Sequence, residues 1–228
     1  MKASLRARRE ILPAAQAALW PQLAPTRALG YVLYGGTAIA LRLGHRASED
    51  FDFFTQRPLD QHELRRALPF LNHAMTLQES ADTLTVMTLP PSPANRGVKV
   101  SFFAGIDFGR IGTPDCTDDG ILQVASLEDL MATKLKVILQ RVEVRDYRDI
   151  AAMIEANVDL AHGLAGARRM FGNSFQPSES LKALTWFQDG DLELLSASEQ
   201  RTLIDAASRV RDLPAVELSS LALGEPTR

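Results

Sequence analysis

Apolar and polar residues alternate in the first half of the chain in a way that predicts strands interleaved with helices. The β-prone run at residues 31–34 stops at two glycines, residues 37–43 have helical spacing, and residues 51–54 form another β-prone run. The same reasoning predicts helices at residues 4–20 and 61–71, strands at residues 74–78, 83–89 and 98–103, a loop at residues 90–97, and a loop with short extended pieces at residues 106–119. This order of elements is typical of an α/β (α+β) fold.

The pattern changes near residue 125, where helical spacing takes over. Ser126, followed by Asp129 three residues later, resembles a capping box, and a long helix is predicted from there to residue 142. A second helix is predicted to start near Asp146, and the remaining residues have a largely helical pattern broken at glycines and prolines. We therefore expect an α/β core at residues 1–125 and a helical region at residues 126–228.

The composition narrows the classes of protein that fit. Of the 228 residues, 46% are apolar and 23% are charged, which is typical of a globular protein, and the net charge of −3 argues against nucleic-acid binding over the whole surface. One cysteine, Cys116, allows neither an intrachain disulfide nor a cysteine-based zinc site. Because no apolar run approaches about 20 residues and the N-terminus does not resemble a secretory signal, we expect a cytoplasmic protein with no membrane partner.

A phosphate-binding turn is the first candidate for chemistry. The strand predicted to end at Tyr34 is followed by Gly35 and Gly36, which let the backbone turn and approach a ligand closely. The helix after these glycines offers free N–H groups and the positive end of its dipole to an anion, and the Thr37 hydroxyl adds a further donor. A glycine pair by itself is more often only a turn, so the interpretation depends on the residues beyond this helix.

Asp50 and Asp52 are the second candidate. Residues i and i+2 of a strand share a face, so the two carboxylates are predicted to project side by side while Phe51 and Phe53 point into the core. Paired carboxylates suit Mg²⁺ or Mn²⁺, which would neutralise charge on a triphosphate. The alternative is a strand edge whose two aspartates simply face water, but the preceding glycine turn favours the metal site.

The two candidates together resemble the pattern of the DNA polymerase β-type nucleotidyltransferase superfamily, in which a glycine pair precedes Asp-x-Asp on a strand. The segment at residues 34–54 is similar to one branch of it, the AbiEii-type nucleotidyltransferase toxins of bacterial toxin–antitoxin and phage-defence systems. The Arg-x-Ser-x-Asp-x-Asp run of that family is matched by Arg46, Ser48, Asp50 and Asp52. The resemblance implies a nucleotidyltransferase-type mixed sheet flanked by helices, with Arg46 and Ser48 among the nucleotide-binding residues.

A second block, in the helices predicted after residue 125, resembles the same family. Lys134, Arg141 and the run at residues 145–150 match its Lys…Arg…(Lys/Arg)-Asp-x-x-Asp-Leu motif. Helical spacing also places Lys134 and Arg141 at the border of an apolar stripe, where a cation needs a partner. For Lys134 that partner is a substrate phosphate, which would make it a nucleotide-binding and catalytic residue, or else Asp146 or Asp149 in a salt bridge. Asp146 is either catalytic or a plain N-cap, and a structural pair is expected between Arg141 and Asp149.

One feature departs from the superfamily pattern, in which a third carboxylate on a later strand completes the metal site. In the strand predicted at residues 98–103 the matching position is Ser101, and serine is neither a carboxylate-like base nor a good magnesium ligand. Four aspartates of the next loop are candidates to replace it, and the sequence does not choose among them: Asp107, Asp115, Asp118 and Asp119. Two carboxylates can still hold a metal–nucleotide complex, so the departure concerns catalysis rather than binding.

The residues and the resemblance together predict a magnesium-dependent nucleotidyltransferase. An acceptor hydroxyl would attack the α-phosphorus of a nucleoside triphosphate and release pyrophosphate. The resemblance implies that the acceptor is RNA, such as a tRNA end, or a protein side chain, and that a cognate antitoxin is a partner. Two alternatives stay open: a catalytically weak or inactive nucleotide-binding module on the same fold, and a protein–protein interaction module that uses the helical half.

Overall fold

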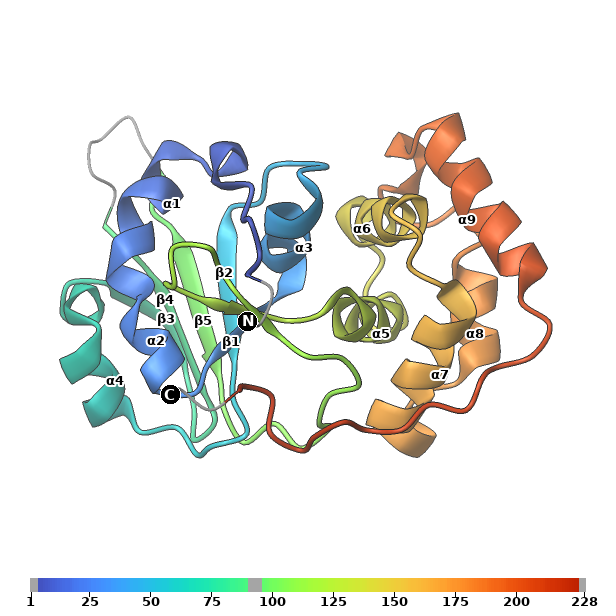
Figure 1. The fold of residues 1–228 in the computed structure, drawn as a ribbon. Coiled ribbons are helices and arrows are strands. Elements are labelled where there is room, and N and C mark those ends of the chain that lie inside the picture. Colours follow the sequence, from blue (N-terminus) through green and yellow to red (C-terminus); the bar gives the residue numbers. More distant parts are fainter. Residues whose placement is uncertain (1–3, 90–95, 226–228) are drawn as a thin grey trace. The chain divides into compact units, whose positions relative to one another are not determined.

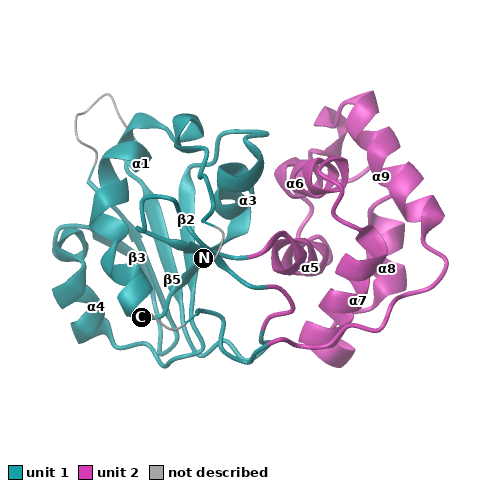
Figure 2. Ribbon diagram, in the orientation of Figure 1, with its two compact units in different colours: residues 1–109, 113–125, 220–228 teal, residues 110–112, 126–219 magenta. Residues whose placement is uncertain are grey.

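A computed structural model describes residues 4–89 and 96–225 of the chain (Figure 1). The chain divides into two compact units (Figure 2). Unit 1 comprises residues 1–109, 113–125 and 220–228, and unit 2 comprises residues 110–112 and 126–219. Most of the loop predicted at residues 90–97 lies outside the described residues. Within the described ranges, the helices are too short or too polar to cross a membrane.

Unit 1 contains a mixed sheet whose strands are β1 (Val32–Tyr34), β2 (Asp50–Phe54), β3 (Met75–Glu79), β4 (Thr83–Met87), β5 (Lys99–Phe103), β6 (Asp115–Cys116) and β7 (Gln123–Val124). Their order across the sheet is β3-β4-β5-β2-β1-β7-β6. Strand β2 runs parallel to β5, and β1 runs parallel to β7, while the other neighbouring pairs are antiparallel. The predicted α/β (α+β) class with a mixed sheet is therefore confirmed.

The helices of unit 1 flank this sheet. They are α1 (Ala14–Leu19), α2 (Pro25–Ala28), α3 (Gly35–Leu43) and α4 (Gln61–Ala67), and short 3₁₀ turns occur at Arg9–Ile11, Trp20–Leu23 and Pro69–Asn72. Figure 1 shows α1, α2 and α4 on one side of the sheet and α3 on the other. The rings of Phe53 and Phe102, on neighbouring strands, stack with their centroids 5.4 Å apart. The ring centroids of Trp20 and Phe51 are 6.3 Å apart. These buried rings pack on one face of the sheet, whereas Asp50 and Asp52 of β2 project from the opposite face.

The prediction of one helix at residues 4–20 is wrong. The Leu5 N–H donates to the Cys116 carbonyl, and Leu5 forms an isolated parallel bridge with Thr117, so the backbone at Leu5 is paired as in a strand beside β6. Helix α1 begins only after Pro13, which lacks an N–H and therefore suits a helix start but not a helix interior. The helical spacing of residues 4–12 thus reflects an extended segment and a 3₁₀ turn.

Other boundaries also differ from the predictions. Helix α3 starts two residues earlier than predicted, directly at Gly35, and the helix predicted to reach residue 142 ends at Val137. Strand β6 lies in the segment predicted as loop with short extended pieces, and it pairs over only two residues with β7. Two-residue strands carry almost no alternation of apolar and polar positions, so the sequence pattern could not give their bounds.

Unit 2 is helical, as predicted for the second half of the chain. It contains α5 (Leu127–Val137), α6 (Val144–Glu155), α7 (Leu160–Phe171), α8 (Pro177–Ala183) and α9 (Ala197–Arg209), with 3₁₀ turns at Gly172–Ser174 and Leu192–Leu194. The Ser126 hydroxyl accepts the Asp129 N–H at 3.1 Å, so the predicted cap of α5 is confirmed. Helices α5 and α7 pack closely because Gly163 leaves room for the Met131 side chain.

Candidate functional site

The candidate site starts at the turn from β1 into α3. Gly35 has a φ of +73°, in the left-handed region that residues with a Cβ rarely adopt. A Cβ built on Gly35 would also lie 2.6 Å from the Oδ2 atom of Asp52, closer than any normal contact. Two independent constraints therefore require glycine here: the backbone conformation, and the close approach of the second aspartate of β2.

Gly36 makes a similar approach to the loop that precedes β2. A Cβ on Gly36 would lie 2.5 Å from Arg46 Nη2 and 3.3 Å from Ser48 Oγ. The Arg46 guanidinium also donates to the Ala47 carbonyl at 2.9 Å. The first turn of α3 therefore lies beside a guanidinium, so an anion at this helix N-terminus would meet both backbone N–H groups and a fixed positive charge.

Thr37 and Ser48 connect α3 to the start of β2. Their hydroxyl oxygens are hydrogen-bonded at 2.9 Å, and the Thr37 hydroxyl also donates to the backbone carbonyl of Asp50. Thr37 is 1% exposed and Ser48 is 8% exposed. Their hydroxyls thus hold the first residue of β2 in place, a role that the sequence pattern did not indicate.

Strand β2 alternates as predicted. Phe51 and Phe53 are fully buried, whereas Asp50, Asp52 and Phe54 are half-buried. The two carboxylates therefore share the face of the sheet opposite the aromatic core, which confirms the predicted alternation. Two negative charges on one face repel each other unless positive charge lies near them.

The neighbouring strand β5 provides positive charge at a residue that the sequence pattern did not single out. In the parallel β2–β5 pair, Asp50 lies opposite Lys99 and Asp52 lies opposite Ser101. Lys99 Nζ lies 2.9 Å from Asp50 Oδ2, and the two side chains are 35% and 28% exposed. The signal for Lys99 was present, because it lies two residues before Ser101 and a strand repeats its faces every second residue.

Ser101 is 2% exposed and occupies the cross-strand position opposite Asp52, where the superfamily pattern leads one to expect an acid. Across residues 4–89 and 96–225, no group of three His, Cys, Asp or Glu side chains could hold a metal ion. Two of the loop aspartates considered as substitutes have other partners: Asp115 pairs with Arg42 at 2.9 Å, and Asp119 pairs with Arg9 at 2.7 Å. In the described parts of the chain, the candidate metal donors on β2 are thus two carboxylates without a third.

The predicted residues of the second block lie in unit 2, where a buried ionic cluster brings them together. Lys134 Nζ on α5 lies 2.5 Å from Asp146 Oδ1 and 2.7 Å from Asp149 Oδ2, both on α6. Lys134 is 7% exposed, and the two aspartate side chains are fully buried. Arg141 Nε lies 2.8 Å from Asp146 Oδ2. The salt-bridge partners proposed for Lys134 are therefore observed, and each buried charge has an opposite charge beside it.

Asp146 is not an N-cap, because Glu143 occupies the N-cap position of α6 and Asp146 lies within its first turn. The helix begins earlier than predicted because Val144 is buried and starts the apolar face of α6. Burial alone would raise the pKa of Asp146, but the hydrogen bond from Arg141 and the charge of Lys134 outweigh it, so the pKa lies below its ordinary value. Asp146 is consequently ionised within this cluster at neutral pH.

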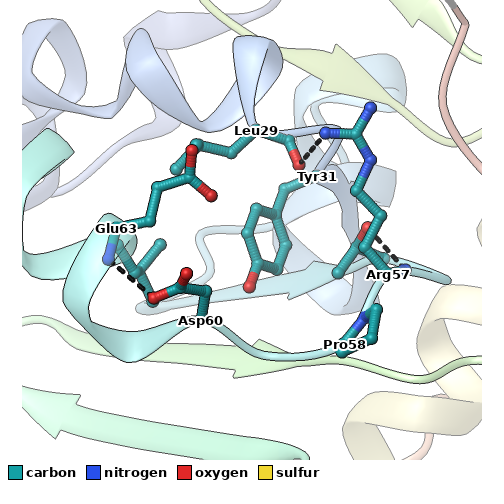
Figure 3. A pocket seen from close by; sticks show the side chains of 8 residues that line it. Leu29, Tyr31, Arg57, Pro58, Asp60 and Glu63 are labelled. Carbon is teal, nitrogen blue, oxygen red and sulfur yellow. Dashed lines mark hydrogen bonds between the residues drawn. The ribbon is translucent and has the colours of Figure 1, made fainter.

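A small pocket at the other end of the sheet was not predicted from the sequence. It is lined by residues that flank β1 and β2 and by residues of α4, and in Figure 3 the Tyr31 hydroxyl points towards Asp60. Burial raises the pKa of Tyr31 to about 12, with further contributions from the negative charges of Glu63 and Asp60. Asp60 in turn caps α4 by accepting the Glu63 N–H at 2.9 Å. This pocket lies where α4 packs on the sheet, and it shares no residue with the candidate site around Asp50 and Asp52.

Strand β1 thus turns into the N-terminus of α3 beside two carboxylates on the neighbouring strand β2. A solved structure supports the fold: the crystal structure of an antigenic nucleotidyltransferase-like protein from Paracoccidioides brasiliensis aligns with a TM-score of 0.51 and 18% identity. The alignment covers 79% of this chain and 89% of that chain. At this identity the likeness concerns the fold alone.

The family is established by the sequence comparisons. The family model described as "Nucleotidyl transferase AbiEii toxin, Type IV TA system" matches residues 23–217. The chain is also similar to an uncharacterized protein of Aquifex aeolicus (strain VF5), with 29% identity over 167 residues that make up 72% of this chain and 77% of the relative. The chain therefore belongs to the AbiEii nucleotidyltransferase toxin family of type IV toxin–antitoxin systems, which confirms the predicted family.

Proposed function

We propose that this protein is a divalent-metal-dependent nucleotidyltransferase that transfers a nucleoside monophosphate from a nucleoside triphosphate to a hydroxyl of RNA or protein. The single observation that carries the proposal is the contact between the Gly35 turn and Asp52. It brings an anion-binding helix N-terminus against one of the two β2 carboxylates. Phosphate and metal would therefore meet at one place.

The donor set of β2 fits a hard divalent cation. Asp50 and Asp52 would hold Mg²⁺ or Mn²⁺, which favour carboxylate oxygens, and phosphate oxygens and water would complete the coordination. When bound, the metal would offset the charge of the triphosphate at the reacting phosphorus. The backbone N–H groups of Gly35, Gly36 and Thr37 in the first turn of α3 and the guanidinium of Arg46 would hold the phosphates, while the Thr37 and Ser48 hydroxyls hold the start of β2.

In the proposed reaction the acceptor's hydroxyl oxygen forms a bond to the α-phosphorus. The bond from that phosphorus to the bridging oxygen breaks, and pyrophosphate leaves with the electron pair. The proton of the acceptor hydroxyl passes to solvent, because Ser101 cannot accept it as a carboxylate would. We assign Lys134 a nucleotide-binding and catalytic role and Asp146 a catalytic role on the family motif. Their buried ion pairs supply a structural role as well.

We also propose that the chain divides into domains at residue 125 and that the protein is cytoplasmic. The proposed partners are an antitoxin and the acceptor of the nucleotide. An antitoxin partner is proposed because the family is named for toxins of type IV toxin–antitoxin systems. RNA, including a tRNA end, and protein are both proposed acceptor classes, because each offers hydroxyl groups.

One observation favours a second candidate, a nucleotide-binding module without turnover. Ser101 stands opposite Asp52 where a third carboxylate would assist transfer, and Lys99 already neutralises part of the charge on Asp50. Such a module would bind a metal–nucleotide complex and leave it unchanged.

A labelling experiment separates the two candidates. The full chain is incubated with Mg²⁺, total cellular RNA and protein, and each of the four α-labelled nucleoside triphosphates in turn. Transfer of label by the wild type and its loss in Asp50→Ala/Asp52→Ala would support the enzyme and identify the acceptor class. Retained metal–nucleotide binding without transfer of any of the four nucleotides would contradict the enzyme and favour the binding module.

A further inference from the structure

The ion pair between Lys99 and Asp50 lies at the centre of the proposed metal site. The two residues are cross-strand neighbours in the parallel β2–β5 pair, and Lys99 Nζ lies 2.9 Å from Asp50 Oδ2. Both side chains are about one-third exposed, so water screens the pair and the flexible lysine stem can move away at little cost. The pair is therefore positioned to form and break as ligands arrive.

The charges on this face explain why a lysine stands here. Asp50 and Asp52 place two negative charges on one face of β2, and the third position on β5 is the uncharged Ser101. Without a metal the two carboxylates repel each other, and the Lys99 ammonium reduces that repulsion. A metal ion that binds Asp50 must displace the ammonium, or else tolerate a positive charge beside it.

A triphosphate changes this balance because it brings acceptors for the displaced ammonium. A lysine ammonium is a compact point charge that binds phosphate oxygens well, and its long stem allows it to turn from Asp50 to a neighbouring ligand. A metal ion carried by a triphosphate would therefore meet less opposition at Asp50 than the metal ion alone.

We propose that Lys99 is an internal counter-ion that leaves Asp50 for the substrate's triphosphate, so that metal and nucleotide bind as one complex and the metal alone binds weakly. The inference rests on the proposed function of Asp50 as a metal ligand. It assigns Lys99 a substrate-binding role for the triphosphate, and it makes metal occupancy of Asp50 depend on the nucleotide.

Calorimetric titration of the full chain tests the inference without any turnover. The probes are Mn²⁺ alone and a premixed equimolar complex of Mn²⁺ with inorganic tripolyphosphate, which carries the phosphates without a base. Lys99→Met is expected to bind Mn²⁺ alone about tenfold more tightly than the wild type and the tripolyphosphate complex about tenfold more weakly. Lys99→Arg keeps the charge and is expected to stay close to the wild type for both probes.

The matched control is Lys182→Met, which removes another lysine from an ion pair with Glu179 at the same 2.9 Å separation. That pair is exposed and lies on α8, so both affinities should equal those of the wild type. Circular dichroism verifies the fold of each variant, and Lys99→Gln replaces Lys99→Met if the latter does not fold.

The outcomes separate this inference from the proposed function. If Asp50→Asn binds Mn²⁺ and its tripolyphosphate complex as the wild type does, Asp50 is not a metal ligand, and both the proposed function and the role of Lys99 are contradicted. If Asp50→Asn loses binding while Lys99→Met matches the wild type with both probes, or weakens both equally, only the role of Lys99 is overturned. If Lys99→Met binds Mn²⁺ alone more tightly and the tripolyphosphate complex more weakly than the wild type does, the role of Lys99 is supported.

Discussion

Asp52 Oδ2 lies so close to the backbone of Gly35 that a Cβ built on that glycine would meet it at 2.6 Å. Replacement by alanine must therefore move the aspartate or the helix N-terminus, and it also forces a Cβ onto a backbone with a φ of +73°. Gly35→Ala is expected to lower the free energy of unfolding by about 1–3 kcal/mol and to weaken Mn²⁺–nucleotide binding at least tenfold. Denaturant unfolding and calorimetry measure the two effects.

Gly172→Ala is the matched control for this change. Gly172 also has a positive φ, +54°, but a Cβ built on it meets nothing within 4 Å. Its replacement should lower stability by about 1–3 kcal/mol through backbone strain alone, because ψ is −134° and this combination suits only glycine, and should leave nucleotide binding unchanged. Equal effects of the two variants on binding would contradict the role given to the Gly35–Asp52 contact.

Ser101→Asp places a third carboxylate opposite Asp52, at a position that is only 2% exposed. Without metal, the added buried negative charge should lower the melting temperature, because it is desolvated and lies beside a like charge. With Mg²⁺ or Mn²⁺ at about one hundred times its dissociation constant, binding should return about 2.7 kcal/mol of stability. Thermal unfolding of this variant in chelator and in saturating metal measures the difference.

Ser101→Asn serves as the uncharged control of similar size. Its melting temperature should change no more between chelator and metal than that of the wild type. A melting temperature of Ser101→Asp that does not depend on metal would show that the β2 carboxylates do not form a metal site.

Lys134→Met removes the ammonium shared by Asp146 and Asp149, whose side chains are fully buried. Breaking a buried ion pair on one side leaves desolvated charge, so the free energy of unfolding of unit 2 should fall by about 3 kcal/mol. Denaturant unfolding followed by circular dichroism tests this, with the exposed Lys182→Met expected to change stability by less than about 0.5 kcal/mol. A Lys134→Met variant as stable as the wild type would contradict the structural role of these ion pairs.

The raised pKa of the Tyr31 phenol predicts that the free energy of unfolding depends on pH in the alkaline range. Its pKa is raised to about 12 in the folded chain from 10.0, first by burial and then by Glu63 and Asp60. The folded state thus holds the proton more tightly, so this contribution to stability is fully present below pH 10 and is lost as pH rises from 10 to 12. The loss approaches about 2 kcal/mol. Unfolding measured across this window should become less pH-dependent in Tyr31→Phe, and an unchanged slope would contradict the assignment.

The sequence predicted the arrangement of the candidate residues on α3 and β2 more accurately than it predicted the element boundaries. Gly35, Gly36, Asp50 and Asp52 were identified because a period of two on a strand and a glycine turn are local signals. Pairing of Leu5 with Thr117 is a contact between distant parts of the chain, so helical spacing at residues 4–12 was misleading. The two-residue strands β6 and β7 exist only through such pairing.

The sequence also could not identify the ion-pair partners of the charged side chains. Lys99 could have been placed on the metal-site face by counting two residues back from Ser101, but its neighbour Asp50 is identified only by the parallel register of β2 and β5. Two acidic partners were possible for Lys134, and it pairs with both. The packing of α5 on α6 places Asp146 and Asp149 beside the Lys134 ammonium. Register and helix packing depend on the whole fold rather than on local spacing.

The most direct test of the central claim compares α-labelled with γ-labelled nucleoside triphosphate in parallel reactions with Mg²⁺, cellular RNA and protein. Nucleotidyl transfer predicts that the α-label becomes attached to an acceptor while the γ-label is released as pyrophosphate, and that Asp50→Asn and Asp52→Asn abolish both. Attachment of the γ-label to an acceptor, or equal transfer by the wild type and both variants, would contradict the account.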